Sequence, residues 1–440
     1  MVWQRQNRKA RPKGFLRMKS CFLPADILLP DFSRTDGYRW AVIACDQFTS
    51  RPEYWEKARE IAGDSPSALD LIFPEAYLGR EEEFLPRIAC SMGECVRRGI
   101  LCEYPNVMIY LERIQSDGRL RRGIIGAVDL ECYDWHPESQ TLIRATEGTV
   151  PERIPPRVRI RQSASLELPH VMLLVDDHER RIIEYFSGRK NELTPAYDFD
   201  LMLGGGHVSA WFIEKEEDIS HVTEAIEKLS APDAALTKYG IARKAPLAIA
   251  VGDGNHSLAT AKAVYENLKA EIGEEAAREH PARYALAELV NIHDDALEFE
   301  PIYRVVFGAD AQKLLASLKE YAAGLHGSAA PQSIRAIYGD REETIEIPTP
   351  EHQLAVGSLQ RFLDGYLADH PGAVVDYIHG VQECEELGRR AGNIAFLFDG
   401  MRKDDLFRSV ICDGPLPRKT FSMGHAEDKR YYIEARRITK

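Results

Sequence analysis

The stretch Pro246-Leu-Ala-Ile-Ala-Val251, followed directly by Gly252-Asp253-Gly254-Asn255-His256-Ser257, decides the fold of this chain. Its first half is a short apolar run that predicts a buried strand, and an amphipathic helix is expected from about Leu258 to Lys269. A strand that turns through glycines into a helix presents free backbone N–H groups, and the positive end of the helix dipole favours an anion there. Gly252 and Gly254 allow the backbone to approach such a ligand closely. The sequence therefore predicts a phosphate-binding junction.

The polar residues of this junction indicate its chemistry. Asp253, Asn255, His256 and Ser257 place an acid, an amide, an imidazole and a hydroxyl within five residues. Neither a Walker A loop nor a dinucleotide-binding fingerprint is present, because GxxxxGK[ST] and GxGxxG do not occur in the stretch. The alternative is a plain glycine turn with an Asn or Ser helix cap. A magnesium ion shared between Asp253 and a substrate phosphate fits the sequence, since Mg²⁺ needs only one or two protein carboxylates.

Length and composition limit the classes of function. The chain has 440 residues, enough for two or three domains, and its net charge of −13 argues against a protein that coats nucleic acid. The eight cysteines form no Cys-x-x-Cys pair, so we expect reduced thiols in a cytoplasmic protein. No apolar run approaches the ~18 residues of a membrane helix. We expect a small-molecule substrate and neither a nucleic acid nor a membrane partner; the oligomeric state stays open.

Strands and helices alternate along the chain, which predicts an α/β fold with a mixed sheet. We expect a disordered basic arm at 1–19, with Met18 as an alternative start, and a main α/β domain at 20–308. A smaller α+β lobe is expected at 309–392, and a segment that returns to the main domain at 393–440. Strands are predicted at 40–44, 107–113, 122–130, 171–175, 208–213, 284–292, 301–306, 333–338 and 393–398, and further helices at 52–63, 81–98, 218–229, 312–324 and 354–367.

Two further segments carry candidate functional residues. In Pro156-Arg-Val-Arg-Ile-Arg161, Arg157, Arg159 and Arg161 recur at period two, which predicts one face of an extended strand. Guanidinium groups bind phosphate with two donors each, whereas the alternative is an edge strand protected by its charges. In Arg144-Ala-Thr-Glu-Gly-Thr149, Glu147 is a candidate general base for a hydroxyl; the alternative is an ion pair with Arg144.

A third candidate is the loop Pro415–Gly424, which carries Lys419 and Thr420 and has a composition that suits an anion, although a plain surface loop has the same composition. The histidines are scattered, and no pair stands four residues apart beside an acid. We therefore expect no zinc, and no haem or flavin.

Four motifs resemble those of a prokaryotic family known only as a domain of unknown function (DUF1015-like). Asp253-Gly-Asn-His-Ser-Leu-Ala-Thr-Ala261 is similar to its Asp-Gly-His-His-Arg-Tyr-x-x-Ala motif, and Arg144–Thr149 to its Arg-x-His-Glu-x-Thr. Ile302-Tyr-Arg-Val-Val306 is similar to Thr-His-Arg-Val-Val, and Leu416-Pro-Arg-Lys-Thr420 to Met-Pro-x-Lys-Ser. The resemblance runs in the same order from about residue 21 onward.

The chain departs from this family pattern at four residues. Asn255 and Ser257 replace the His and Arg of the junction motif, and Thr146 and Tyr303 replace histidines. Loss of the junction arginine weakens the expected grip on phosphate and leaves the phosphoryl donor open.

The junction is also similar to that of the ParB/sulfiredoxin-like superfamily, which includes free-serine kinases that use ADP or pyrophosphate. The resemblance implies a ParB/sulfiredoxin-like phosphate-binding core and a phosphotransferase of serine metabolism that acts on a small hydroxy amino acid such as L-serine. An O-phosphoserine phosphatase or reverse transferase, and a non-catalytic nucleotide sensor, remain as alternatives. The residues implied as catalytic are Glu147, His256 and Asp253. Those implied to bind phosphate or nucleotide are Gly252, Gly254, Asn255, Ser257, Arg144, Thr149, Arg157, Arg159, Arg161, Lys419 and Thr420.

Overall fold

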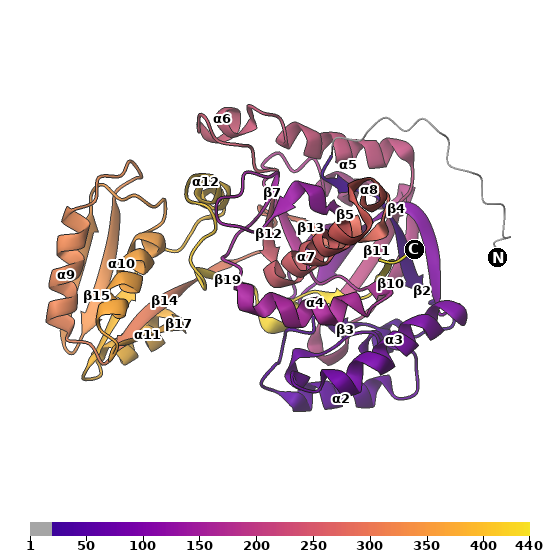
Figure 1. The fold of residues 1–440 in the computed structure, drawn as a ribbon, viewed down its shortest axis with the longest axis horizontal. Helices are drawn as coiled ribbons and strands as arrows, with labels where there is room; N and C mark the ends of the chain where they lie inside the picture. The colour runs from indigo at the N-terminus through magenta and orange to yellow at the C-terminus, as the bar shows by residue number, and fades with distance from the viewer. Residues whose placement is uncertain (1–19) are drawn as a thin grey trace.

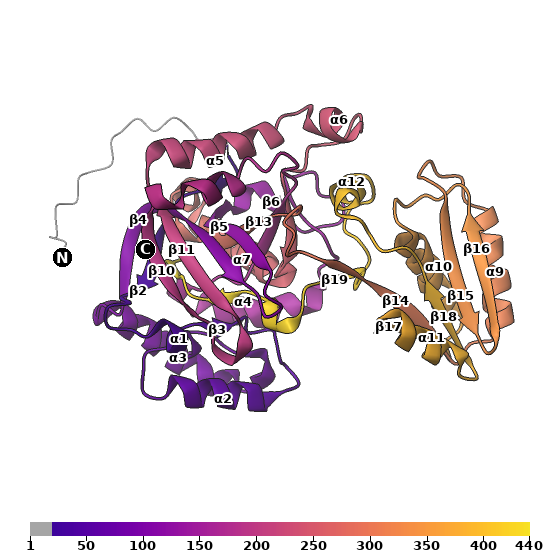
Figure 2. The ribbon, with the colours of Figure 1, turned by 180° about the vertical axis from the view of Figure 1, so that it is seen from behind.

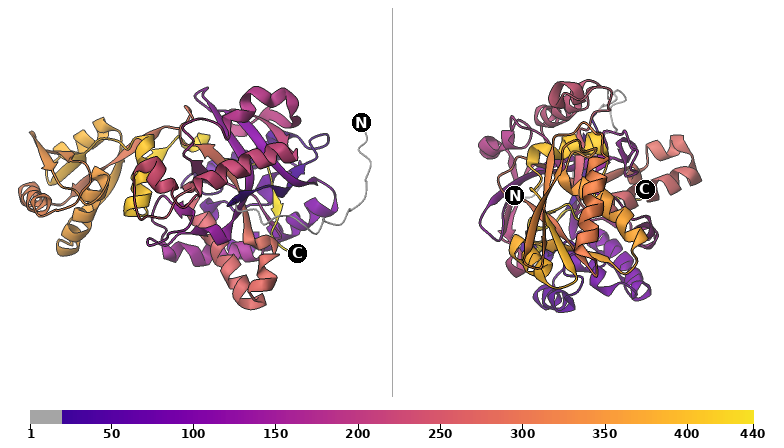
Figure 3. Two further views of the ribbon diagram at one scale, coloured as in Figure 1. Left: turned by 90° about the horizontal axis from the view of Figure 1, so that it is seen from above. Right: turned by 90° about the vertical axis from the view of Figure 1, so that its left-hand side faces the viewer.

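The computed structural model describes residues 20–440. The expected basic arm at 1–19, including Met18, lies outside the described residues. Figure 1 shows a large body and, at the left, a smaller lobe that is joined to it by few segments. The view from behind in Figure 2 and the view from above in Figure 3 show the same separation, so the described part of the chain is elongated.

The large body is built on an eleven-stranded mixed sheet. Its main path runs β10 (Thr194–Asp200), β11 (His207–Ile213), β4 (Leu101–Ile114), β5 (Leu120–Asp129), β13 (Tyr284–Asn291), β9 (Met172–Val175), β12 (Ile249–Asp253), β7 (Ile143–Ala145) and β6 (Tyr133–Asp134). Off this path, β1 (Phe22–Leu23) pairs with β5 and β2 (Ala25–Pro30) with β4. Most pairs are antiparallel, but β13 with β9, β12 with β7 and β6 with β7 are parallel. The predicted mixed α/β class is confirmed, and the ParB/sulfiredoxin-like assignment stays a prediction.

Alternating side chains divide this sheet into two buried faces, as strand geometry requires. On β4, Ile109 and Leu111 pack with the helices α2 (Pro52–Ala62) and α3 (Glu81–Arg97). Met108 and Tyr110 point to the opposite face, which α5 (Glu216–Leu229) and α7 (Asn255–Ile272) cover. The sequence predicted all four helices, because each carries apolar residues at helical spacing.

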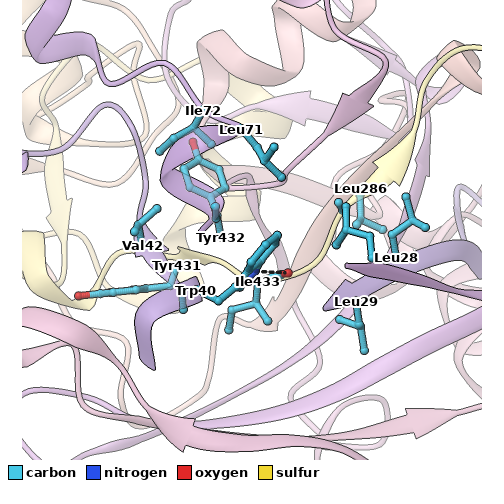
Figure 4. Packing of buried hydrophobic residues seen from close by; sticks show 14 of the residues in the cluster. Leu28, Leu29, Trp40, Val42, Leu71, Ile72, Leu286, Tyr431, Tyr432 and Ile433 are labelled. Carbon is cyan, nitrogen blue, oxygen red and sulfur yellow. Dashed lines mark hydrogen bonds between the residues drawn. The ribbon is translucent and has the colours of Figure 1, made fainter. Parts of the chain in front are cut away.

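Residues 431–435 pass through the core of the large body, as Figure 4 shows around Trp40. The indole N–H of Trp40 donates to the carbonyl of Ile433 at 3.1 Å, and Leu28 and Ala435 exchange two backbone hydrogen bonds. The strand expected at 40–44 is shorter, since Trp40 ends the helix α1 (Gly37–Trp40), which the Asp36 side chain caps. Only β3 (Val42–Ile43) is extended, and it pairs with β20 (Tyr431–Tyr432). A similar two-residue pair joins β8 (Leu166–Glu167) to β21 (Arg436–Arg437).

The smaller lobe contains a six-stranded sheet. It comprises β16 (Arg341–Ile347), β15 (Gln332–Tyr338), β18 (Asn393–Leu397), β14 (Phe299–Phe307) and β17 (Val374–His379), with β19 (Phe421–Met423) paired to β14. The helices α9 (Ala311–Ala323), α10 (Ala355–Asp369) and α11 (Val381–Arg389) pack against it. The expected domain limits stay a prediction, but β14 and β18 lie outside the 309–392 range. The remaining α-helices are α4 (Ile154–Gln162), α6 (Ala234–Tyr239), α8 (Glu274–Arg278) and α12 (Lys403–Asp413).

The strand predicted for the three arginines was wrong, because residues 154–162 form the helix α4 (Ile154–Gln162). Prolines at 155 and 156 occupy its first turn, where no intrahelical N–H is needed and their fixed φ suits a helix. Among residues 20–440, no helix combines the length and apolar character that a membrane crossing requires.

Candidate functional site

The glycine junction and Glu147 lie at the same edge of the large sheet. The parallel strands β7 and β12 are neighbours, so the segments that follow them leave the sheet on the same side. The hydroxyl of Thr146 donates to the carbonyl of Val251 at 2.6 Å and fixes the two segments together. Glu147 and residues 252–257 therefore line one cavity of about 940 Å³.

The start of α7 presents unpaired backbone donors to this cavity. Gly254 precedes the helix with φ +77°, a left-handed conformation that favours glycine, and an added Cβ would lie 3.0 Å from the Cα of Val171. The first intrahelical bond runs from the N–H of Leu258 to the carbonyl of Gly254. Among the described residues, no acceptor faces the N–H groups of Asn255, His256 and Ser257. Such a set of donors at the start of a long helix suits an anion.

Asp253 is paired with Lys429, a residue that was not predicted to belong to the site. One carboxylate oxygen accepts the N–H of Gly254 at 2.9 Å, and the other lies 3.1 Å from the Lys429 ammonium. Burial favours the neutral acid, but the Lys429 charge outweighs it and lowers the pKa of Asp253. Each carboxylate oxygen thus has one protein partner, and the magnesium ion expected at Asp253 stays a prediction. No step proposed below uses a metal.

Glu147 is half-buried and has one oxygen free of protein donors. Its Oε1 accepts the backbone N–H of Lys419, while no described residue donates to Oε2. Burial raises the pKa of Glu147, which makes its carboxylate a stronger base. The alternative ion pair with Arg144 is wrong, because the Arg144 guanidinium donates to the carbonyls of Ala245 and Pro246 at 3.1 and 2.7 Å. Arg144 does not line the cavity.

His256 lies in the cavity as a neutral hydrogen-bond donor. Its Nε2 is 3.2 Å from the backbone N–H of Val150 and accepts from it, so the ring proton is on Nδ1. Partial burial, with Arg157 and Arg153 nearby, lowers the pKa of His256 to about 4. The ring is therefore uncharged near pH 7, and its Nδ1–H is a donor for a ligand oxygen.

The helical form of residues 154–162 separates the three predicted arginines. Arg157 and Arg161, one turn apart, line the cavity and pair with the carboxylates of Glu75 and Glu167. Arg159 lies on the opposite side of α4, exposed and outside the cavity lining. The predicted row of three guanidiniums on one face was wrong, whereas phosphate binding by Arg157 and Arg161 stays a prediction.

The loop that follows α12 carries the predicted Lys419 and Thr420 into the cavity lining. Thr420 Oγ1 donates to the Pro417 carbonyl at 2.7 Å, so this hydroxyl can serve a ligand only as an acceptor. Arg304, fully buried, donates to the carbonyls of Lys419 and Arg418 at 2.9 and 3.2 Å. Arg304 thus positions the loop whose N–H donates to Glu147. The sequence could have indicated this role, because Arg304 lies within the Ile302–Val306 motif.

The other predicted residues divide between cavity and core. Asp253, Gly252, Gly254, Asn255 and Ser257 line the cavity. The amide oxygen of Asn255 is buried without a protein partner, which leaves it available to a ligand. Thr149 is outside the lining, and its buried hydroxyl has no partner among the described residues.

One wall of the cavity is apolar, and the cavity also reaches the smaller lobe. Its apolar wall comes from residues before and within α3, namely Leu71, Ile72, Phe73, Leu85, Ile88 and Met92. Ile302 and His379 contribute from β14 and β17 of the second sheet. The cavity therefore joins a polar end at the glycine junction to an apolar end large enough for an organic group.

We expect the His256 ring to titrate near pH 4. Because folding lowers the pKa of His256, the unfolded chain binds this proton more readily than the folded protein does. The stability that the neutral ring contributes is therefore fully present above its ordinary pKa of 6.5. That contribution is lost as the pH falls from 6.5 to about 4. Nitrogen-15 NMR of histidine-labelled protein measures the titration, and the resonance absent from His256→Gln gives the assignment. A midpoint at or above the ordinary value would contradict the neutral tautomer described here.

Fold and site define a class: a mixed α/β protein whose cavity is built on a glycine-rich strand-to-helix junction. The family model described as "Protein of unknown function (DUF1015)" matches residues 31–436, so the chain belongs to that family. The predicted family membership is confirmed. None of the curated proteins matches the chain.

Several solved structures are similar at low identity. A free serine kinase mutant in complex with ADP shares 11% identity with a TM-score of 0.36, covering 70% of this chain and 91% of its own. A conserved hypothetical protein from Pyrococcus furiosus has 12% identity and a TM-score of 0.33, with 71% and 94% covered. SbnI with a C-terminal truncation from Staphylococcus aureus has 11% identity and a TM-score of 0.33, with 68% and 82% covered. These values carry no inference about activity.

Proposed function

We propose that the chain is a phosphotransferase that moves a phosphoryl group from ADP or pyrophosphate to the hydroxyl of a small amino acid such as L-serine. One observation carries the proposal: the unpaired N–H groups of Asn255, His256 and Ser257 and the free oxygen of Glu147 line one cavity. The first set suits a donor phosphate and the second suits an acceptor hydroxyl.

The terminal phosphate of the donor would lie on the start of α7. There the helix dipole and the three N–H groups oppose its negative charge, and Nδ1–H of His256 adds a side-chain donor. The family arginine is replaced by Ser257, and Lys429, 3.1 Å from Asp253 and in the cavity lining, would supply positive charge near the phosphate. The buried amide oxygen of Asn255 would accept one hydrogen bond from the ligand.

Glu147 would take the acceptor's proton during transfer. The serine oxygen attacks the terminal phosphorus, the new O–P bond forms, and the bond from phosphorus to the bridging oxygen breaks. AMP leaves when ADP is the donor, and inorganic phosphate leaves when pyrophosphate is the donor. The serine proton passes to Glu147 Oε2 and then to solvent. Overall, serine and ADP give O-phosphoserine, AMP and one proton.

Phosphorus-31 NMR tests the proposal directly. The purified chain would be incubated with L-serine and ADP, ATP or pyrophosphate, and separately with O-phosphoserine alone. New O-phosphoserine in a donor mixture is expected. Release of inorganic phosphate from O-phosphoserine alone would instead assign a phosphatase, and absence of turnover in every mixture would contradict phosphotransfer on serine.

A further inference from the structure

A cluster of two histidines and one aspartate lies outside the cavity, where the start of α12 meets two loops of the large sheet. His178 follows β9, His293 follows β13, and Asp404 belongs to the first turn of α12. One potential ligand atom from each residue lies within 4.8 Å of the other two. None of the three lines the cavity described above, so the cluster is a separate feature.

The orientation of His293 leaves one ring nitrogen available to a ligand. Its Nε2 lies 2.7 Å from a carboxylate oxygen of Asp176, a buried acid that also contacts Lys238 at 3.0 Å. The proton therefore belongs on Nε2, and the lone pair of Nδ1 points toward Asp404, whose Oδ1 is 4.0 Å away. A carboxylate that fixes the outer nitrogen of a histidine is the arrangement that accompanies metal-bound histidines.

The other two side chains have no competing partners. His178 contacts His293 ring to ring at 4.4 Å, and no described residue forms a hydrogen bond with its imidazole. Among residues 20–440, Asp404 is within ion-pair distance of His293 alone, while the neighbouring Arg402 pairs with Asp405 and adds only a longer-range attraction to Asp404. The nearby cations are likewise engaged elsewhere, Arg180 with Asp295 and Lys403 with the carbonyl of Asp294.

We propose that His178, His293 and Asp404 form a binding site for a divalent metal ion of the zinc class. Two imidazoles and one carboxylate are ligands that Zn²⁺ favours, with a water molecule completing a tetrahedron. Ligand atoms on one Zn²⁺ lie about 3.4 Å apart, given metal–ligand bonds of about 2.1 Å. The three ligand atoms lie within 4.8 Å of one another, and rotation of the exposed His178 and Asp404 side chains would bring them to that separation.

The site would tie α12 to the two loops. One side of α12 already packs on the sheet through its apolar residues Leu406, Phe407, Val410 and Ile411. The first turn of the helix lies outside this packing, and the metal would hold it in place. The sequence indicated no zinc because no pair of its histidines stands four residues apart beside an acid. This cluster combines three segments that are far apart in the chain.

Isothermal titration of the EDTA-treated full chain with ZnCl₂ tests the site. We expect one Zn²⁺ per chain, at least tenfold weaker binding in His178→Gln and in Asp404→Asn, and loss of binding in the double variant. Zn²⁺ should also raise the melting temperature of the wild-type chain and leave that of the double variant unchanged. Both positions are exposed, and circular dichroism checks that the variants fold.

His136→Gln is the matched control, because this exposed histidine also lies beside an acid, 2.6 Å from Asp134. Its removal should leave zinc affinity unchanged. Absence of zinc binding to the wild-type chain would overturn the proposal. Full affinity in the double variant, or an equal loss in His136→Gln, would overturn it as well, since the ion would then bind elsewhere.

Discussion

Glu147→Gln is expected to reduce phosphoryl transfer to L-serine by about 10²- to 10⁴-fold, the usual contribution of a general base. The amide keeps the shape of the side chain and its acceptor for the Lys419 N–H, but it does not take up the serine proton. Ligand affinity should therefore change little, because the anion is held by the start of α7. Initial rates by phosphorus-31 NMR and Kd values by calorimetry measure the two quantities separately.

Glu184→Gln is the matched control for this variant. Glu184 is also half-buried, its pKa is also raised by burial, and it lies outside the cavity lining, where it accepts hydrogen bonds from Asn291. Its substitution should leave turnover unchanged. Equal rates for Glu147→Gln and the wild-type chain would remove Glu147 from the proposed mechanism, while a parallel loss of ligand affinity would assign it to binding.

Lys429→Met is expected to weaken pyrophosphate binding by about 10- to 100-fold, since a hydrogen bond to a charged group contributes about 1.5–3 kcal/mol and 1.4 kcal/mol corresponds to tenfold. The variant keeps much of the side-chain volume and removes the ammonium 3.1 Å from Asp253. The pKa of Asp253 should then rise, because burial would no longer be opposed by this charge. Calorimetry at a fixed salt concentration measures the affinity.

Lys269→Met provides a comparison for the loss of one lysine. Lys269 has similar side-chain exposure, 20% against 16% for Lys429, and it pairs with Glu131 outside the cavity. Pyrophosphate affinity should be unchanged in this variant. If both lysine variants lost affinity equally, the effect would come from the net charge of the chain; if neither did, Lys429 would have no part in anion binding.

The elements around the glycine junction were predictable because their signals are local. Residues 246–251 form a short apolar run, the glycines follow it, and the observed β12 and α7 begin and end within a few residues of expectation. The arginine segment shows the limit of this reasoning. Over six residues, alternation of arginine and apolar residues fits a strand and a helix about equally. The prolines at 155 and 156 favour the helix, because they occupy its first turn.

The site itself was only partly predictable, because its residues depend on strand pairing. Glu147 and Asp253 come together since β7 and β12 are parallel neighbours, a relation that neither segment reveals alone. Arg144 was predicted to bind phosphate because of its charge. Its side chain does not line the cavity and donates instead to backbone carbonyls that precede β12. Lys429 stands in a short polar segment without periodicity, so only the folded structure connects it to Asp253.

The passage of residues 431–435 through the large core has a consequence for biosynthesis. Trp40 and Leu28 leave the ribosome early, but their partners Ile433 and Ala435 emerge only after some 390 further residues, as the separation of 393 between Trp40 and Ile433 shows. The strands β14 to β18 of the smaller lobe lie between residues 299 and 397 and are complete before that. During translation the smaller lobe can therefore fold first. The apolar face of the large sheet stays accessible to chaperones until residues 431–435 are synthesised and complete the core.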